Sequence, residues 1–251
     1  MRLNVWRKVE LLGYPKYQIY QHHEMFSFTL DSLLLADYIR IRKDVKNILD
    51  LGTGNGVIPI YLTLKTEAKI TGIEVQEDVY KMALANVLEN KLKAQITLVL
   101  GDLHQLNCYP LKSYDLISAN PPYFKVTKKS NLNLSPYKQI AKHELMVTLE
   151  SLLKTVSKLL KNGGYFYLIY FPERLKECFN LLEKYQLEPK RMRLVYPNQA
   201  KKANHVLLEI KKSPAKGGLI IEAPLYIYQG DKWSDEVLKI YNCGSDNNAI
   251  E

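Results

Sequence analysis

The stretch Asn120-Pro121-Pro122-Tyr123 combines residue types that could activate an amine of low nucleophilicity. An amine conjugated to a ring or a carbonyl group has a delocalised lone pair. The side-chain oxygen of Asn120 and the carbonyl of Pro121 can accept both amine hydrogens, which pulls the nitrogen toward tetrahedral geometry and aims its lone pair. The prolines lock the turn, and Tyr123 can stack on a planar substrate. Such a site acts through orientation and electrostatics and needs no strong base.

A glycine-rich turn, Asp50-Leu51-Gly52-Thr53-Gly54-Asn55-Gly56, precedes this motif in the chain. Gly52 and Gly54 allow positive φ and a close approach of a ligand to the backbone. The spacing differs from the G-x-G-x-x-G of diphosphate cradles. Asp50 leads the turn, where a carboxylate favours a cation or an amine over a phosphate. S-adenosylmethionine carries both a sulfonium and an ammonium group, and it is the cofactor that this turn indicates.

Two further acids follow apolar segments. Glu74 ends the segment 69–74, where a carboxylate can accept hydrogens from ribose hydroxyls. Asp102 follows the segment 96–100, where it can accept from the adenine amino group. An acid at each of three successive segment ends predicts one cofactor site at the carboxyl edge of a parallel sheet.

The elements that must position these residues alternate along the chain. Strands are expected at 47–51, 69–74, 96–100, 114–119, 165–170, 190–196 and 205–210. Helical patterns are expected at 58–64, around 79–87, at 145–160 with a C-cap at 162–164, and at 173–185. Strands that alternate with helices indicate a parallel sheet, whereas the last two strands, with no helix between them, suggest an antiparallel edge hairpin.

We therefore expect a Rossmann-like α/β fold with a mostly parallel seven-stranded sheet. Residues 1–251 are expected to form a single domain, with an N-terminal cap at 1–45, a catalytic core at 46–245 and a flexible tail at 246–251.

Composition narrows the class of protein. The chain has 251 residues, of which 47% are hydrophobic and 24% are charged, as in an ordinary globular protein. No apolar run is long enough to span a membrane, no signal peptide is apparent, and the three cysteines have no zinc-ligand spacing. We expect a cytoplasmic, metal-free monomer.

The net charge of +9 suggests a polyanionic partner, although a lysine-rich composition alone could produce it. Basic clusters lie beside the substrate motif and in the last third of the chain. The residues expected to contact the substrate or RNA are Phe124, Lys125, Lys128, Lys129, Arg191, Arg193, Lys201 and Lys202.

These motifs together resemble those of class I methyltransferases, and Asn120 to Tyr123 is similar to the (D/N)PP(Y/F/W) motif of enzymes that methylate amino nitrogens. Other segments resemble the bacterial tRNA1(Val) adenine-37 N6-methyltransferase family. They are Phe28 to Ala36, Lys142-His143-Glu144, Phe171 to Leu175 and Lys190 to Val195, and the resemblance covers roughly Asn4 to Tyr241.

The resemblance implies methyl transfer from S-adenosylmethionine to adenine N6 in a tRNA. It implies that Asp50, Gly52, Glu74 and Asp102 hold the cofactor, and that Asn120, Pro121 and Tyr123 hold the target base. Gly54 and Asn120 are included among the cofactor-binding residues. Asp31 would pack beside the methionine end of the cofactor, or it could instead cap the helix that follows. Lys142 stands where the family commonly has Arg, and His143 and His205 are expected in structural or RNA-contact roles.

Three alternatives stay open. A methyltransferase of a protein glutamine side chain meets the same lone-pair problem with the same motif. A guanine N2 methyltransferase of rRNA would differ only in substrate. An RNA-binding module with a relic cofactor site would lack catalysis.

Overall fold

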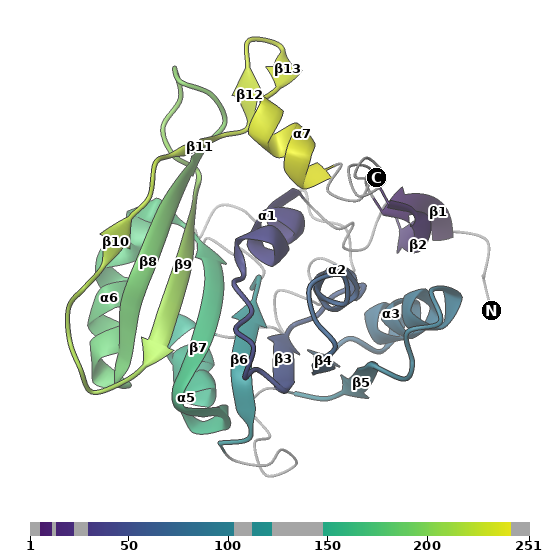
Figure 1. The fold of residues 1–251 in the computed structure, drawn as a ribbon, viewed down its shortest axis with the longest axis horizontal. Coiled ribbons are helices and arrows are strands. Elements are labelled where there is room, and N and C mark those ends of the chain that lie inside the picture. Colours follow the sequence, from purple (N-terminus) through teal and green to yellow (C-terminus); the bar gives the residue numbers. More distant parts are fainter. Residues whose placement is uncertain (1–5, 12–13, 23–29, 103–111, 122–147, 242–251) are drawn as a thin grey trace, which may run out of the picture.

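A central mixed sheet organises the protein (Figure 1). The computed structural model describes residues 6–11, 14–22, 30–102, 112–121 and 148–241. The strand order is β10-β8-β9-β7-β6-β3-β4-β5, and β11 also pairs with β8. The main strands are β3 (Asn47–Leu51), β4 (Lys69–Glu74), β5 (Ile96–Leu100), β6 (Tyr114–Ala119), β7 (Leu160–Tyr170), β8 (Leu187–Tyr196) and β9 (His205–Lys212).

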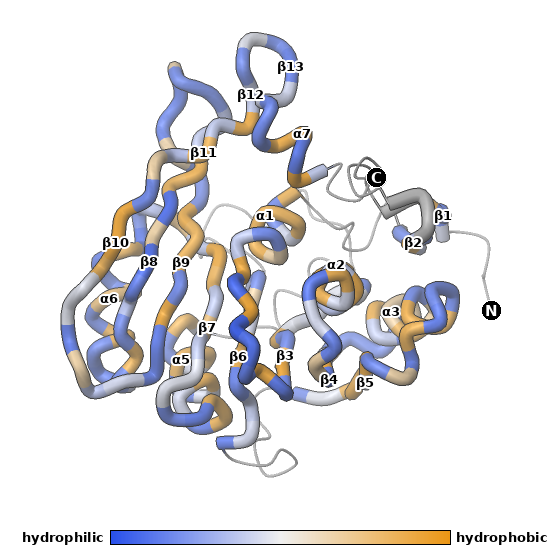
Figure 2. The backbone as a smooth tube through the Cα atoms, viewed as in Figure 1, coloured by the Kyte–Doolittle hydropathy of each residue, from blue (hydrophilic) through white to orange (hydrophobic). Residues whose placement is uncertain are grey.

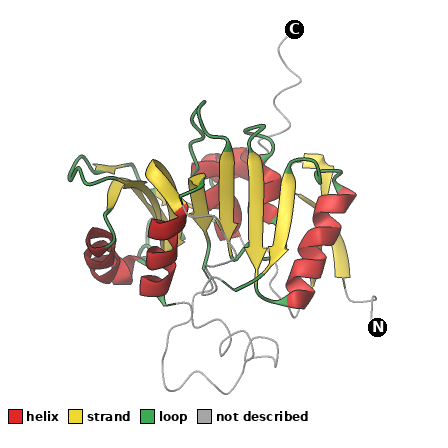
Figure 3. Cartoon of the chain, turned by 90° about the horizontal axis from the view of Figure 1, so that it is seen from below, coloured by secondary structure: helices red, strands yellow, loops and turns green. Residues whose placement is uncertain are grey.

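Alternate residues along the strands face two separate hydrophobic cores. Ile48 and Tyr167 contribute to one core, whereas their neighbours Leu49 and Phe166 contribute to the other. The first core takes residues from α1 (Leu30–Tyr38), α2 (Val57–Leu62), α3 (Glu77–Glu89) and α7 (Asp235–Tyr241). The second takes residues from α5 (Leu149–Leu159) and α6 (Leu175–Lys184), which follows a 3-10 turn at Pro172–Arg174. Helices cover both faces of the sheet (Figure 3), which explains why the central strands β3, β4 and β6 are buried along most of their length. Hydrophobic residues recur along these strands (Figure 2).

The antiparallel pairing expected at the edge of the sheet is confirmed, but the sheet has more strands than expected. β9 runs antiparallel to both β7 and β8. Two short strands, β10 (Ile220–Ile221) and β11 (Leu225–Tyr226), pair in parallel with β8 and give a nine-stranded sheet where seven strands were expected. A two-residue strand has no alternation of its own, so the pattern of the sequence does not reveal it.

The expected helix C-cap at 162–164 is wrong. The helix α5 ends at Leu159, and the extended residue Leu160 begins β7 directly. Gly163 and Gly164 lie instead in an irregularity of the β6–β7 pairing. A Cβ on Gly164 would stand 2.9 Å from the carbonyl oxygen of Asp115, so the glycine permits close approach of two strands.

An N-terminal hairpin packs on α3 through side-chain amides. β1 (Trp6–Leu11) and β2 (Tyr14–His22) pair antiparallel. The amide of Asn86 both accepts from Tyr20 N at 2.6 Å and donates to Tyr20 O at 3.2 Å. The amide of Asn90 likewise accepts from Gln18 N at 2.9 Å and donates to Gln18 O at 2.8 Å. Asn86 and Asn90 are four residues apart on the helix, a rise of about 6 Å. Gln18 and Tyr20 are two residues apart on the strand, about 6.7 Å. The two spacings match, so both contacts can form together.

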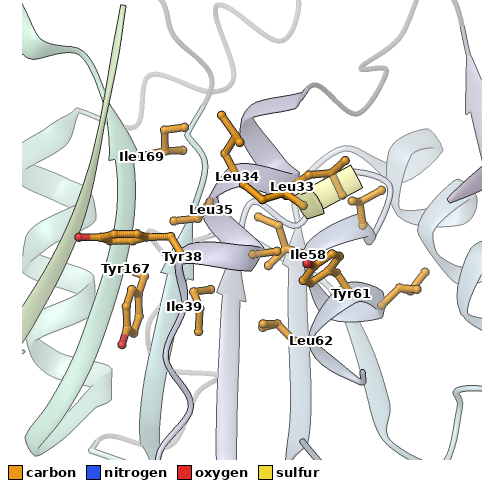
Figure 4. Close-up of a cluster of buried hydrophobic side chains, with 14 of the residues drawn as sticks. Leu33, Leu34, Leu35, Tyr38, Ile39, Ile58, Tyr61, Leu62, Tyr167 and Ile169 are labelled. Carbon is orange, nitrogen blue, oxygen red and sulfur yellow. The ribbon is translucent and has the colours of Figure 1, made fainter. Parts of the chain in front are cut away.

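The helix α1 lies against α2 and β7 (Figure 4). Its leucines Leu33, Leu34 and Leu35 are fully buried, and Tyr38 meets Tyr167 edge to face with ring centroids 6.4 Å apart. Apolar burial and aromatic contact therefore fix the helix along its length.

A buried ion-pair network secures the end of α1. The guanidinium of Arg191 donates to Glu209 Oε2 at 3.0 Å and to the carbonyl of Tyr38 at 2.7 Å, and it stacks 3.9 Å from the Tyr38 ring centroid. It also pairs with Glu222 at 3.1 Å. The side chains of Arg191 and Glu209 are each only 6% exposed. This network ties β8 and β9 to the end of α1.

Arg191→Ala removes the more deeply buried of the two cationic partners of Glu209, which keeps Arg42 at 3.0 Å and the Tyr167 hydroxyl at 3.1 Å. This variant should therefore lower the free energy of unfolding by about 3 kcal/mol, at the lower end of the range for a broken buried ion pair. Chemical denaturation monitored by circular dichroism measures this change. Lys202→Ala, at an exposed loop position, is the control and should stay within about 0.5 kcal/mol of wild type. A stable Arg191→Ala protein with weakened RNA binding would contradict the structural role.

Candidate active site

The glycine turn between β3 and α2 has three residues in the left-handed region. Gly52, Gly54 and Gly56 have φ values of 68°, 59° and 84°. A Cβ on Gly52 or Gly54 would meet no atom within 4 Å, whereas one on Gly56 would stand 3.6 Å from the Ala83 Cβ. The first two glycines thus border open space that a ligand can enter, and the third serves the packing of α3.

Glu74, the last residue of β4, fixes the shape of this turn. Its Oε2 accepts from the backbone N–H of Gly54 at 2.9 Å, and its Oε1 accepts from those of Val75 and Gln76, both at 3.0 Å. The residue is 5% exposed. Burial raises the pKa of this carboxyl above its ordinary value, and the three backbone N–H groups act in the opposite direction.

The acceptor capacity of Glu74 is limited by these contacts. A carboxylate has about four lone-pair positions, and three are used. In this state Oε2 can accept one more hydroxyl hydrogen. A contact to a ribose through both carboxylate oxygens would require release of one of the two N–H groups on Oε1, that of Val75 or that of Gln76.

Asp50, at the end of β3, is completely buried beside β6. The Ser118 hydroxyl donates to Asp50 Oδ1 at 2.6 Å. Among the residues that the structure describes, Asp50 Oδ2 and the Thr53 hydroxyl have no hydrogen-bond partner of ordinary geometry. Burial raises the pKa of Asp50 to about 6, although the hydroxyls of Ser118 and Thr53 act to lower it.

Asn120 follows β6 directly and contacts the start of α1. Its Nδ2 donates to the Ser32 hydroxyl at 2.9 Å. Next to Ser32, Asp31 Oδ1 lies 3.6 Å from Nδ1 of His205, the first residue of β9. The His205 ring stacks on Phe171 with centroids 5.9 Å apart. Because β9 is antiparallel, its start reaches the same edge of the sheet as the ends of β6 and β7.

The strand register brings these residues to one place. Asp50 pairs with Ser118 and with Gly72 on the two neighbouring strands. Glu74, which ends β4, and Asn120, which follows β6, therefore lie on either side of the glycine turn. Pro121 is half-buried after Asn120, and Asp102 lies two residues beyond the end of β5. Tyr123, Phe124, Lys125, Lys128, Lys129, Lys142 and His143 lie outside the described residues.

The expectation that Arg191 contacts RNA needs correction, since its guanidinium is buried and paired with Glu209 and Glu222. Arg193 is also engaged, with two bonds of 2.6 and 2.8 Å to Glu236. Lys201 and Lys202 differ, because both are exposed in the loop between β8 and β9. That loop lies at the same sheet edge as Asn120.

Ser118 and Ser32 were not singled out from the sequence. Ser118 is a polar residue in an apolar strand, two positions before Asn120, and this signal could have identified it. Ser32 gives no local signal, because its partner Asn120 lies 88 positions away.

The chemistry of the donors fits S-adenosylmethionine. The open space over Gly52 and Gly54 accepts a ligand close to the backbone. Glu74 retains acceptor capacity for a hydroxyl, and the carboxylates of Asp50 and Glu74 make the neighbourhood favourable for a cation. Among the described residues, no group of three His, Cys, Asp or Glu side chains is arranged to hold a metal ion.

Residues 42–240 match a family model described as a methyltransferase domain. A tRNA1(Val) (adenine(37)-N6)-methyltransferase of Porphyromonas gingivalis is 31% identical over 189 residues, which cover 70% of this chain and 72% of the relative. The chain belongs to this methyltransferase family. A relative of the same name from Flavobacterium psychrophilum is 24% identical over 87% of this chain and 94% of its own.

Solved structures agree with the fold. A predicted O-methyltransferase from Agrobacterium tumefaciens has a TM-score of 0.66 at 20% identity and covers 84% of this chain and 95% of its own. A geranyl diphosphate methyltransferase in complex with SAM has a TM-score of 0.53 at 10% identity, over 72% of this chain and 84% of its own. The class I methyltransferase fold expected from the sequence is confirmed. No helix in the described part of the chain is long and apolar enough to cross a membrane.

Asp50→Asn should make the stability of the protein less dependent on pH. The pKa of Asp50, raised to about 6 by burial, means that the folded state binds this proton more tightly than the unfolded chain. Stability from this group therefore falls as pH rises from about 4 to beyond 6, by at most about 3 kcal/mol. Thermal denaturation between pH 4 and 8 should show the variant gaining stability over wild type at the upper end.

Asp115→Asn provides the opposite case. Burial raises the Asp115 pKa, but Lys161 and the backbone N–H groups of Lys46 and Asn47 outweigh it, so the pKa is lowered. This variant should lose stability relative to wild type at neutral pH. If Asp50→Asn follows the wild-type profile, the electrostatic assignment of Asp50 is wrong, and the same outcome for Asp115→Asn overturns that of Asp115.

Proposed function

We propose that this protein transfers the methyl group of S-adenosylmethionine to the N6 amine of adenine 37 in a tRNA, next to the anticodon. The observation that carries the proposal is the meeting of a glycine turn, Glu74 and Asn120 at adjacent strand ends. The names of the relatives support the substrate, since each is a tRNA1(Val) (adenine(37)-N6)-methyltransferase.

The cofactor-binding residues would act in two ways. Gly52 and Gly54 would let the ligand lie against the backbone, and Glu74 would accept from a ribose hydroxyl. Asp102 would accept from the adenine amino group of the cofactor, and Asp31 would lie beside its methionine end. When bound, S-adenosylmethionine supplies an electrophilic methyl group on a positively charged sulfur.

The substrate-binding residues would orient the amine. Asn120 Oδ1 and the Pro121 carbonyl would accept the two N6 hydrogens, so that the lone pair points at the methyl carbon. Positive charge that developed on the attacked nitrogen would strengthen both hydrogen bonds, so Asn120 and the Pro121 carbonyl would stabilise the transition state. The methylated nitrogen would release one proton to solvent and become the N6-methyladenosine product. Tyr123 would stack on the target base.

Asn120→Ala should lower kcat roughly a hundredfold or more, because it removes an acceptor that acts mainly in the transition state. Cofactor affinity, measured by calorimetry, should stay within a few-fold of wild type. Glu74→Ala is the complementary variant and should weaken cofactor binding by about tenfold or more.

The product assay uses radiolabelled cofactor with total tRNA, rRNA and release factors, followed by mass spectrometry of nuclease and protease digests. N6-methyladenosine at tRNA position 37 is expected. N2-methylguanosine in rRNA or methylglutamine in a protein would assign the alternative substrates instead. Binding of RNA without any methylated product would indicate a relic cofactor site.

Lys201 and Lys202 are proposed to contact tRNA phosphates. Replacing both with alanine should reduce the slope of log K against log salt by about 1–2, since each phosphate contact contributes about 0.7–0.9. The KM for tRNA should rise while cofactor affinity stays unchanged. Lys154 and Lys158, both exposed on α5, form the matched control pair. If replacing this pair has the same effect on RNA binding, Lys201 and Lys202 make no specific phosphate contact and only the net charge of the protein matters.

A further inference from the structure

The orientation of the Asn120 amide is a chemical problem that the sequence motif alone does not solve. The terminal torsion of an asparagine side chain is broad and roughly two-fold, and its two ends have opposite hydrogen-bonding character. The oxygen can accept hydrogens from a substrate amine. The NH2 group would instead oppose N–H donors with further N–H donors, so an amide turned the wrong way would repel the substrate.

A serine hydroxyl can accept a hydrogen from the NH2 end of an amide or donate one to its oxygen. In the described structure the hydroxyl next to Asn120 accepts from the NH2 end. Asn120 Nδ2 donates to the hydroxyl of Ser32 at 2.9 Å. Ser32 is half-buried in the first turn of α1. When the NH2 end of the amide is directed at Ser32, the Oδ1 end is directed away from α1.

The position of Ser32 is itself fixed. The three residues that follow it, Leu33 to Leu35, are at most 1% exposed and pack in the core shown in Figure 4. At the other end of the helix, Arg191 donates to the Tyr38 carbonyl and stacks on the Tyr38 ring. These contacts anchor α1, and Ser32 with it, against the sheet.

We propose that Ser32 is a positioning residue whose hydroxyl holds the Asn120 amide with its oxygen toward the substrate amine. This inference rests on the proposed function, because it assigns Asn120 Oδ1 to the acceptor of an amine. The proposal adds Ser32, a residue outside the Asn-Pro-Pro-Tyr motif, to the substrate site. It also gives α1 a role in catalysis in addition to its role in the hydrophobic core.

Kinetics of three proteins test the proposal. Ser32→Ala should lower kcat roughly two- to tenfold, which is the effect of losing one neutral hydrogen bond. The KM for tRNA and the affinity for S-adenosylmethionine should stay within about twofold of wild type. Ser32→Thr retains a hydroxyl at the same position and should recover most of the lost kcat.

A double-mutant cycle separates positioning from a general structural role. In single-turnover assays, Ser32→Ala should have no further effect in an Asn120→Ala background, because the group that it orients is gone. An equal loss in both backgrounds would overturn the proposal, as would an unchanged kcat in Ser32→Ala alone.

A spectroscopic measurement makes the test independent of the substrate. The side-chain NH2 signal of Asn120 in 15N-labelled protein, assigned by its absence in Asn120→Ala, should shift in Ser32→Ala and return close to its wild-type position in Ser32→Thr. An unshifted signal in Ser32→Ala would overturn the contact itself. If the contact is present and the wild-type protein methylates a different amine, the proposed substrate fails while the positioning role of Ser32 stands.

Discussion

The buried carboxylate of Glu74 is the interaction on which the arrangement of the site depends. A carboxylate that is 5% exposed must have hydrogen-bond donors around it, and three backbone N–H groups supply them. One of these, from Gly54, belongs to the turn after the neighbouring strand. The end of β4 and the glycine turn after β3 therefore take their shapes together, before any ligand enters. The same contacts limit how a ligand can use this acid, since most of its acceptor positions are already taken.

The second half of the sheet is joined to this site through α1. The helix comes before the first strand of the core in sequence, yet its end is held by Arg191 of β8 and, through that residue, by Glu209 of β9. Its first turn faces Asn120 and His205. The helix α1 therefore contacts both the antiparallel edge of the sheet, at its last residue, and the end of the parallel strand β6, at its first turn.

Features that depend on neighbouring residues could be predicted from the sequence, and features that depend on distant contacts could not. The strands 47–51, 69–74, 96–100 and 114–119 agree with the structure because each is an apolar run bounded by turn residues. Gly163 and Gly164 were misread because a glycine pair suits a helix C-cap and a strand irregularity equally, and only the approach of the Asp115 carbonyl decides. Arg191 was misplaced because its partners Glu209 and Glu222 lie 18 and 31 positions away. Ser32 was missed for the same reason.

The two asparagines on α3 have a consequence for the behaviour of the protein at high concentration. An unpaired strand edge is a template on which another chain can add a strand and begin to aggregate. β2 pairs with β1 on one side, and on the other its outward N–H and C=O groups at Gln18 and Tyr20 are satisfied by Asn90 and Asn86. The amides take the place of a third strand at these positions. At these two positions the backbone of β2 has no free groups to offer to a strand of another molecule.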